Sequence, residues 1–146
     1  MKTIYYNNKL AGLILFDGYS TIMLFGFILT RHSRLSLDTE THEQIHQLQY
    51  AECMLLGLLP SLPLCVSSSW LWLLLIPVFY YLLYLGEWLS GFARHLFTDW
   101  GKGMVAINHK AYNSVPFERE ARINQGCGCY FKERKWFAWF RYYGKI

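Results

Sequence analysis

The sequence predicts a mainly α-helical protein with a short N-terminal β element, embedded in a membrane or bound to one. Its composition is 53% hydrophobic and 18% aromatic, with only 16% charged residues, whereas a soluble globular domain carries about 25% charged residues. No charged residue occurs from Cys53 to Gly86, and an uncharged stretch of that length can enter a bilayer. Because the chain has 146 residues, we expect one domain over residues 1–146.

The net charge argues against a nucleic-acid-binding protein, and the cysteines argue against a zinc ribbon and a disulfide-rich protein. A formal net charge of +4 is too modest and too scattered to indicate a nucleic-acid partner, but it suits the anionic surface of a membrane. Cys53 and Cys65 lie in apolar sequence and are typical of small buried side chains. Cys127 and Cys129 are too close together for a zinc ribbon. The cysteines therefore predict no disulfide framework.

The β element is expected at about residues 18–34. Residues 21–30 are rich in β-branched and aromatic side chains, which predicts one buried strand after a turn at Asp17-Gly18. The alternative is a membrane segment over residues 10–30. Asp17 and three glycines in that window disfavour the alternative.

A helix is expected at residues 38–59. Asp38 is the predicted N-cap, and Glu40 suits the positive end of the helix dipole. Pro60 is expected to end the helix, because a proline inside a helix removes one backbone hydrogen bond. The first half of this helix is polar and its second half, from Cys53 onward, is apolar.

Residues 70–97 predict a transmembrane or apolar helix. From Trp70 to Leu89 only Glu87 is charged, and about 20 apolar residues span the hydrocarbon core of a bilayer. Trp70 and Trp88, near the two ends of that stretch, fit an aromatic belt. A buried core helix of a soluble protein is the alternative.

This helix carries one polar stripe at helical spacing, made of Tyr80, Tyr84, Glu87, Gly91 and Arg94. Ionisable residues on an apolar helix usually face protein or a water-filled cavity. The other interpretation is an ion pair between Glu87 and Arg94 near the membrane surface.

Two further elements follow. Residues 115–125 predict a helix with acidic residues in its first turns. Residues 130–146 interleave basic and aromatic side chains, as interfacial membrane anchors do. An aromatic cluster that docks on the domain is the alternative for this tail.

The most specific motif is His42-Glu43-x-x-His46 in the predicted helix 38–59. Residues four apart lie on one face of a helix, so both imidazoles can bind one Zn²⁺. Glu43 projects from the adjacent face, where a carboxylate can act as general base toward water. A polar helix turn with two solvated histidines is the alternative.

A catalytic zinc needs a third protein ligand. In gluzincin metallopeptidases a later helix supplies it through a glutamate-x-x-alanine segment, which Glu118 to Ala121 resembles. The resemblance implies that Glu118 is the third ligand, carried by the helix at residues 115–125. It also implies a metalloprotease-like core in which this helix packs against the His-Glu-x-x-His helix.

The sequence departs from the family pattern at Arg122, where an aspartate often follows the alanine. Glu120 is the second candidate ligand, because Asn124 follows it at the spacing of the family's other glutamate-to-aspartate pattern. Glu87 is the third candidate. Over roughly residues 18–125, the chain also resembles short, uncharacterised membrane proteins described as metallopeptidases.

We therefore expect a zinc-dependent metallopeptidase acting at or in a membrane, with Glu43 as the general base and Zn²⁺ as cofactor. Its expected partners are a peptide or protein substrate and a lipid membrane, and no nucleic acid. Tyr112 or His109 is the candidate for binding the oxyanion or the substrate. The strand at residues 21–30 is expected to pair with an extended substrate.

The sequence is compatible with two functions other than a peptidase. A non-catalytic membrane scaffold or interaction protein with a degenerate or structural metal site is the principal alternative. A membrane iron oxygenase needs many histidines, and this chain has 5.

The location of the site follows from the ligand set. His46 and Glu118 must reach one metal, so the apolar sequence between them crosses the membrane an even number of times, re-enters it or lies in its surface. Lysines and arginines on both sides of that sequence place the site on the cytoplasmic side by the positive-inside tendency.

Overall fold

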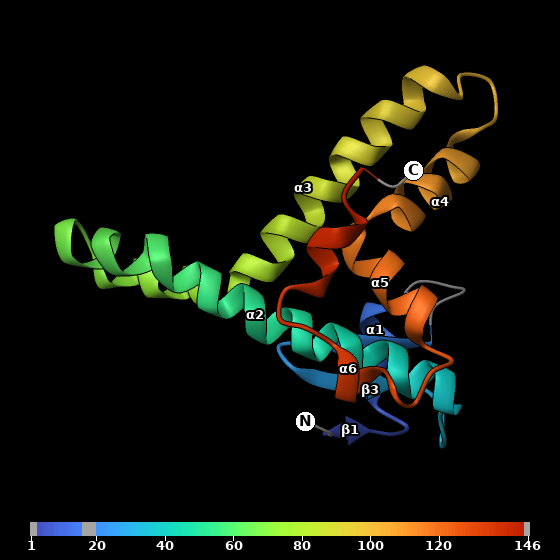
Figure 1. Cartoon of the computed structure of the whole chain (residues 1–146), viewed down its shortest axis with the longest axis horizontal. Helices are drawn as coiled ribbons and strands as arrows, with labels where there is room; N and C mark the ends of the chain where they lie inside the picture. Colours follow the sequence, from blue (N-terminus) through green and yellow to red (C-terminus); the bar gives the residue numbers. More distant parts are fainter. Residues whose placement is uncertain (1–2, 16–19, 145–146) are drawn as a thin grey trace. The chain divides into compact units, whose positions relative to one another are not determined.

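A computed structural model of the protein describes residues 3–15 and 20–144 (Figure 1). Most of these residues are helical, and a small sheet lies near the N-terminus, which confirms the coarse fold class. The predicted turn at Asp17-Gly18 and the start of the 18–34 element lie outside the described residues.

By its internal contacts the chain divides into two compact units. The first comprises Met1–Ala51 and Ala121–Arg134, and the second comprises Glu52–Glu120 and Lys135–Ile146. Folding as one domain stays a prediction.

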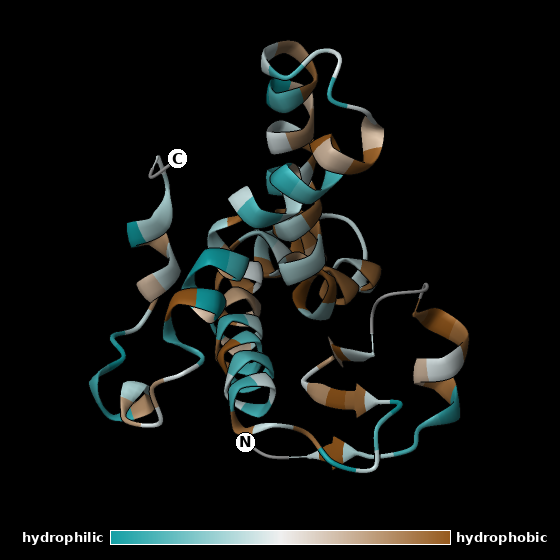
Figure 2. Cartoon of the chain, turned by 90° about the vertical axis from the view of Figure 1, so that its right-hand side faces the viewer, coloured by the Kyte–Doolittle hydropathy of each residue, from teal (hydrophilic) through white to brown (hydrophobic). Residues whose placement is uncertain are grey.

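The sheet of the first unit contains β1 (Ile4–Tyr5), β2 (Thr21–Leu24) and β3 (Phe27–Thr30) in the order β1-β3-β2. Strand β3 pairs parallel to β1 and antiparallel to β2. The prediction of one strand over residues 21–30 is wrong, because the chain turns back at Phe25 and Gly26. Their φ angles of 48° and 82° are the left-handed conformation of a tight hairpin turn. Both hairpin strands are mainly hydrophobic (Figure 2).

A short helix, α1 (Lys9–Ile14), precedes this hairpin and was not predicted. Its N-cap is Asn8, whose side chain accepts from the backbone N–H of Leu10 and Ala11 at 2.8 and 3.2 Å. At its other end the Arg31 guanidinium donates to carbonyl oxygens of the last turn, including that of Gly12 at 3.0 Å. Arg31 thus satisfies carbonyls that a helix C-terminus leaves unpaired.

The motif helix is α2 (Leu37–Ser67), which begins one residue earlier than predicted. Its cap is Ser36, whose hydroxyl accepts from the backbone N–H of Thr39 at 3.1 Å. The predicted cap, Asp38, lies instead in the first turn of the helix. There its charge still favours the positive end of the helix dipole.

Helix α2 continues through Pro60 and Pro63 to Ser67, so the predicted end at residue 59 is wrong. Inside the helix, the Ser61 hydroxyl donates to the carbonyl of Gly57 at 2.6 Å. Pro60 and Pro63 remove the N–H donors that would reach the carbonyls of Leu56 and Leu59, four residues earlier. Gly57 also brings α2 close to the following helix, since an added Cβ would lie 3.0 Å from the Cβ of Phe79.

The predicted helix at 70–97 is a 3₁₀ turn, η1 (Trp70–Leu74), followed by α3 (Leu75–Thr98). Helix α4 (Met104–Ser114) was not predicted, and it lies beside α3 (Figure 1). The expected helix at 115–125 is present as α5 (Pro116–Asn124). Pro116 occupies the first helical position, where its missing N–H removes no helix bond.

The basic and aromatic tail forms α6 (Tyr130–Glu133) and the 3₁₀ turn η2 (Ala138–Tyr142). In the second unit Glu52 accepts from the Phe137 N–H at 2.9 Å and from the Trp139 indole at 3.1 Å. The Trp139 ring lies 4.5 Å from that of Phe117 and is 1% exposed. This part of the tail therefore docks as an aromatic cluster, the alternative noted above.

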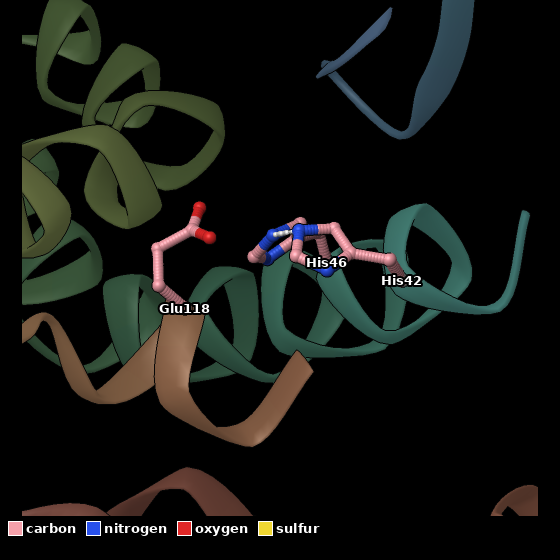
Figure 3. Close-up of side chains that lie close together, drawn as sticks. All are labelled: His42, His46 and Glu118. Carbon is pink, nitrogen blue, oxygen red and sulfur yellow. Dashed lines mark hydrogen bonds between the residues drawn. The ribbon is translucent and has the colours of Figure 1, made fainter. Parts of the chain in front are cut away.

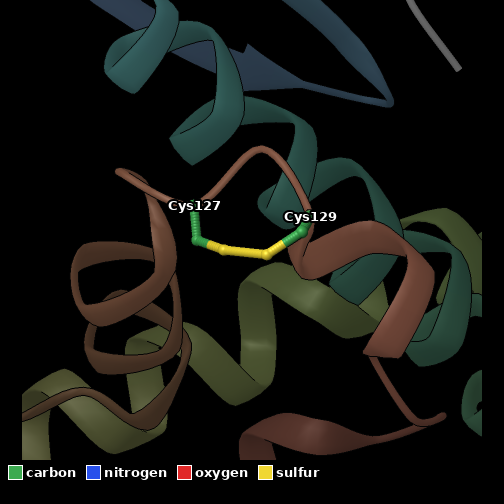
Figure 4. Close-up of a disulfide and its surroundings, with 2 residues drawn as sticks. All are labelled: Cys127 and Cys129. Carbon is green, nitrogen blue, oxygen red and sulfur yellow. A yellow bond between two sulfur atoms is a disulfide. The ribbon is translucent and has the colours of Figure 1, made fainter.

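Cys127 and Cys129 form a disulfide in the loop after α5 (Figure 4). The sequence did not predict this bond. Cys53 is buried and free, and Cys65 is half-buried and free.

Two helical stretches among the described residues are long and apolar enough to cross a membrane, Leu37–Ser67 and Trp70–Thr98. In the second stretch only 6% of the most apolar window is buried inside the protein. Val66, Leu59 and Trp70 are 89%, 72% and 69% exposed. A core helix of a soluble protein would bury such side chains, because each Å² of apolar surface left in water costs about 25 cal/mol.

Candidate metal centre

The two motif histidines lie on one face of α2, as their spacing predicts. Their Nε2 atoms are 3.0 Å apart, and their rings meet edge to face with centroids separated by 4.7 Å. His46 is 5% exposed, and His42 is half-buried.

A glutamine amide holds the other nitrogen of each ring. His42 Nδ1 lies 3.1 Å from Oε1 of Gln125, and His46 Nδ1 lies 2.7 Å from Oε1 of Gln49. An amide oxygen only accepts, so with the glutamine amides in these orientations the ring proton of each histidine lies on Nδ1. In that tautomer the Nε2 atom of each ring is an acceptor that can bind a metal.

Two imidazole nitrogens 3.0 Å apart can share one proton or one metal cation. Two nitrogen ligands of a tetrahedral zinc, at Zn–N of 2.0–2.1 Å, lie about 3.3 Å apart. The observed separation is within a few tenths of an ångström of that value. The donor set and the tautomers therefore fit a divalent metal such as zinc.

Glu118, on α5, is the third member of this group. One ligand atom each from His42, His46 and Glu118 lies within 4.8 Å of the others (Figure 3). Glu118 is 3% exposed, and its Oε1 accepts from the Tyr84 hydroxyl at 2.9 Å. A buried carboxylate needs a cation or strong donors to stay ionised.

The other predicted carboxylates lie outside this group of three ligands. Glu43 follows His42 in α2 and is 7% exposed. Glu120 is fully buried in α5. Burial first, and then the nearby Glu87 carboxylate, raise the pKa of Tyr143.

The two candidates for binding the oxyanion or substrate both lie on α4. His109 is exposed, and its Nδ1 is 3.0 Å from the amide nitrogen of Asn113. Tyr112 is half-buried. Neither belongs to the ligand group, and a role in substrate binding stays a prediction for both.

The supporting side chains Gln49, Gln125 and Tyr84 were not predicted as site residues. Gln49 follows His46 by three residues, a helical spacing that was available as a signal. Gln125 is 83 residues away from His42 in the sequence, so no local spacing pattern relates the two residues. Tyr84 belongs to the polar stripe, so its inward orientation was expected although its partner was not.

We expect Gln49→Leu to lower zinc affinity about 10–100-fold, because an outer partner fixes the tautomer and orientation of a ligand histidine. The measurement is competition with a chromogenic zinc chelator. Gln44→Leu is the matched control, since the Gln44 amide contacts Glu40 at 2.9 Å. Equal affinities in the two variants would show that the Gln49 contact does not support the ligand.

Comparison with protein-family models, with curated proteins and with solved structures found no match. The gluzincin likeness therefore rests on the motif and the Glu118 segment.

Proposed function

We propose that the protein is a zinc-dependent metallopeptidase that acts at or in a membrane. The observation that carries this proposal is the opposed pair of Nε2 atoms on His42 and His46, 3.0 Å apart. Glu118 completes the three-ligand set of a catalytic zinc. Packing of its helix against the His-Glu-x-x-His helix is part of the proposal.

The roles of the residues follow from their chemistry. His42, His46 and Glu118 would hold the metal, and a zinc ion in such a site polarises a carbonyl and acidifies water. Glu43 takes a proton from the attacking water and delivers it to the leaving amine. Tyr84 donates to Glu118 and thereby orients that carboxylate.

An extended peptide is the substrate class that the first unit favours. Among the described residues strand β2 is at an edge of the sheet order β1-β3-β2, and an edge strand can pair with an added strand. The Gln47 amide donates to the carbonyl of Gly26 at 2.6 Å. This bond ties the hairpin turn to α2 one residue after His46.

The test is cleavage of a mixture of unstructured peptides by detergent-purified protein loaded with zinc. Mass spectrometry should detect new peptide ends, which a zinc chelator prevents and added zinc restores. Cleavage that survives the chelator would contradict a metallopeptidase. Stoichiometric zinc without any cleavage would favour the alternative, a membrane scaffold with a structural metal.

Membrane insertion is supported by the exposed apolar helices, and it predicts the behaviour of the protein on fractionation. We expect the protein to sediment with membranes, to resist extraction by alkaline carbonate and to be released by detergent. A monodisperse soluble protein without detergent would contradict membrane insertion.

We propose the cytoplasmic side for the site on the basis of the positive residues that flank the apolar sequence. The Cys127–Cys129 disulfide favours an oxidising compartment instead. Protease accessibility of the tail in sealed right-side-out vesicles decides between these two sides.

A further inference from the structure

A cavity of about 230 Å³ lies within the second unit. It is bordered by the C-terminal half of α3, by the junction of α4 and α5, and by the end of η2. Its lining includes Glu87, Ser90, Arg94, His95, Arg119 and Tyr142. Part of the polar stripe predicted from the sequence, from Glu87 to Arg94, thus faces a cavity.

The charge of this cavity is positive. Arg94 and Arg119 line it, and neither guanidinium has an ion pair with any residue that the structure describes. The ion pair of Glu87 with Arg94, the alternative interpretation of the stripe, is absent from the described residues. Glu87, the one lining carboxylate among them, lies close enough to the Tyr143 hydroxyl to help raise the pKa of Tyr143, after the larger effect of burial.

Asp99, which contacts the lining residue His95, forms no ion pair with these arginines among the described residues. Its carboxylate lies 2.6 Å from Lys102, 2.8 Å from Lys110 and 3.1 Å from His95. Hydrogen bonds from Lys102 first, and then from Lys110, hold the pKa of Asp99 well below its usual range. Asp99 is therefore fully engaged, and the arginines keep their charge for another partner.

Close helix packing shapes the wall of the cavity. A Cβ added to Gly91 would lie 2.5 Å from the Ser114 hydroxyl oxygen, so the absent side chain lets α3 approach α4. Ser114 donates to the carbonyl of Ala111 at 2.7 Å, which fixes its position. The Ser90 hydroxyl adds a neutral donor to the lining.

We propose that this cavity binds a phosphate group. Two guanidiniums offer planar forks of N–H donors that match phosphate oxygens. A phosphate carries more charge and more acceptor oxygens than a carboxylate, so it fits two cations and flanking hydroxyl groups better.

The depth of Arg94 in the proposed membrane orientation favours a lipid head group as the source. Arg94 lies five residues beyond Leu89, which corresponds to about 7.5 Å along a helix. The head-group layer of a bilayer is about 5–7 Å thick on each side of the hydrocarbon core. The cavity itself does not depend on the metal centre.

The test uses the full chain in a non-ionic detergent and measures binding by isothermal titration calorimetry. The probes are dihexanoyl phosphatidic acid and inorganic phosphate, with acetate for comparison. Arg94→Gln and Arg119→Gln should each weaken phosphatidic acid binding about tenfold or more, because each removes charge-assisted hydrogen bonds. Arg34→Gln is the control with the same change of charge, since exposed Arg34 does not line the cavity.

Binding of both phosphate probes supports a site for the phosphate group from either source, and binding of the lipid alone assigns the head group. No binding, equal binding of acetate, or affinity unchanged in both arginine variants would overturn the proposal. If a glutamine variant fails to elute like the wild type, Arg94→Lys and Arg119→Lys replace it. Lysine keeps the positive charge but lacks the planar fork of guanidinium N–H donors. A loss of phosphatidic acid affinity smaller than in the glutamine variants would therefore support the site, whereas wild-type affinity would overturn the proposal. Zinc content should be the same in all these variants, which separates this site from the metal centre.

Discussion

Glu43→Gln is expected to keep one zinc ion per chain and to lose peptide hydrolysis. Glutamine preserves the size and hydrogen-bonding shape of the side chain but cannot accept a proton from water at neutral pH. General-base catalysis contributes about 10²–10⁴-fold to a rate, so the cleavage rate should fall by that factor. The measurement pairs zinc content with the rate of cleavage of one peptide identified in the mixture.

Glu40→Gln is the matched control, because Glu40 lies on the same helix one turn earlier and contacts Gln44 at 2.9 Å. This variant should retain both zinc and activity. If Glu43→Gln loses its zinc instead, Glu43 is a ligand and the assigned roles are wrong. If it retains full activity, the general base is another group.

Glu118→Gln is expected to weaken zinc binding by more than the roughly 10–100-fold that removal of an outer partner costs. An amide oxygen is a neutral and poorer ligand for zinc than a carboxylate. Glu118 is 3% exposed and accepts from Tyr84, so the amide keeps the volume and leaves the affinity change attributable to the ligand. Chelator competition gives the zinc affinity.

Glu120→Gln is the control within the same helix. Glu120 is fully buried, so the change is expected to alter the free energy of unfolding while zinc affinity stays near that of the wild type. Glu87→Gln should likewise act through its contact with Tyr143. A large loss of zinc in Glu120→Gln, with little in Glu118→Gln, would move the third ligand to Glu120.

The local pattern predicted much of the fold. The uncharged sequence after Cys53 indicated the apolar helices, and the 115–125 helix was found within a residue of its bounds. The hairpin turn was missed because Phe25 adopts a left-handed conformation, at φ 48°, that bulky residues rarely take. The end of α2 was misplaced because Pro60 stops helices in water more strictly than in apolar surroundings.

In the candidate site, the residues that could be predicted from the sequence are those that belong to a motif with a fixed spacing. His42 and His46 are four apart, and the Glu118-x-x-Ala121 segment resembles a known ligand segment, so both were nominated. The Gln125 contact to His42 joins residues far apart in the chain, and no local period encodes such a contact. Tyr84 was placed on an inward stripe, but its bond to Glu118 depends on tertiary packing.

Zinc content of the purified protein, wild type against His46→Ala, tests the central claim most directly. The chain should be expressed with zinc, solubilised in detergent and analysed by mass spectrometry of the metal together with a protein assay. The opposed Nε2 atoms predict about one zinc per wild-type chain and almost none in His46→Ala, since loss of one imidazole leaves two ligands. Wild-type protein without zinc, or equal zinc in the variant, would contradict a metal centre at His42 and His46.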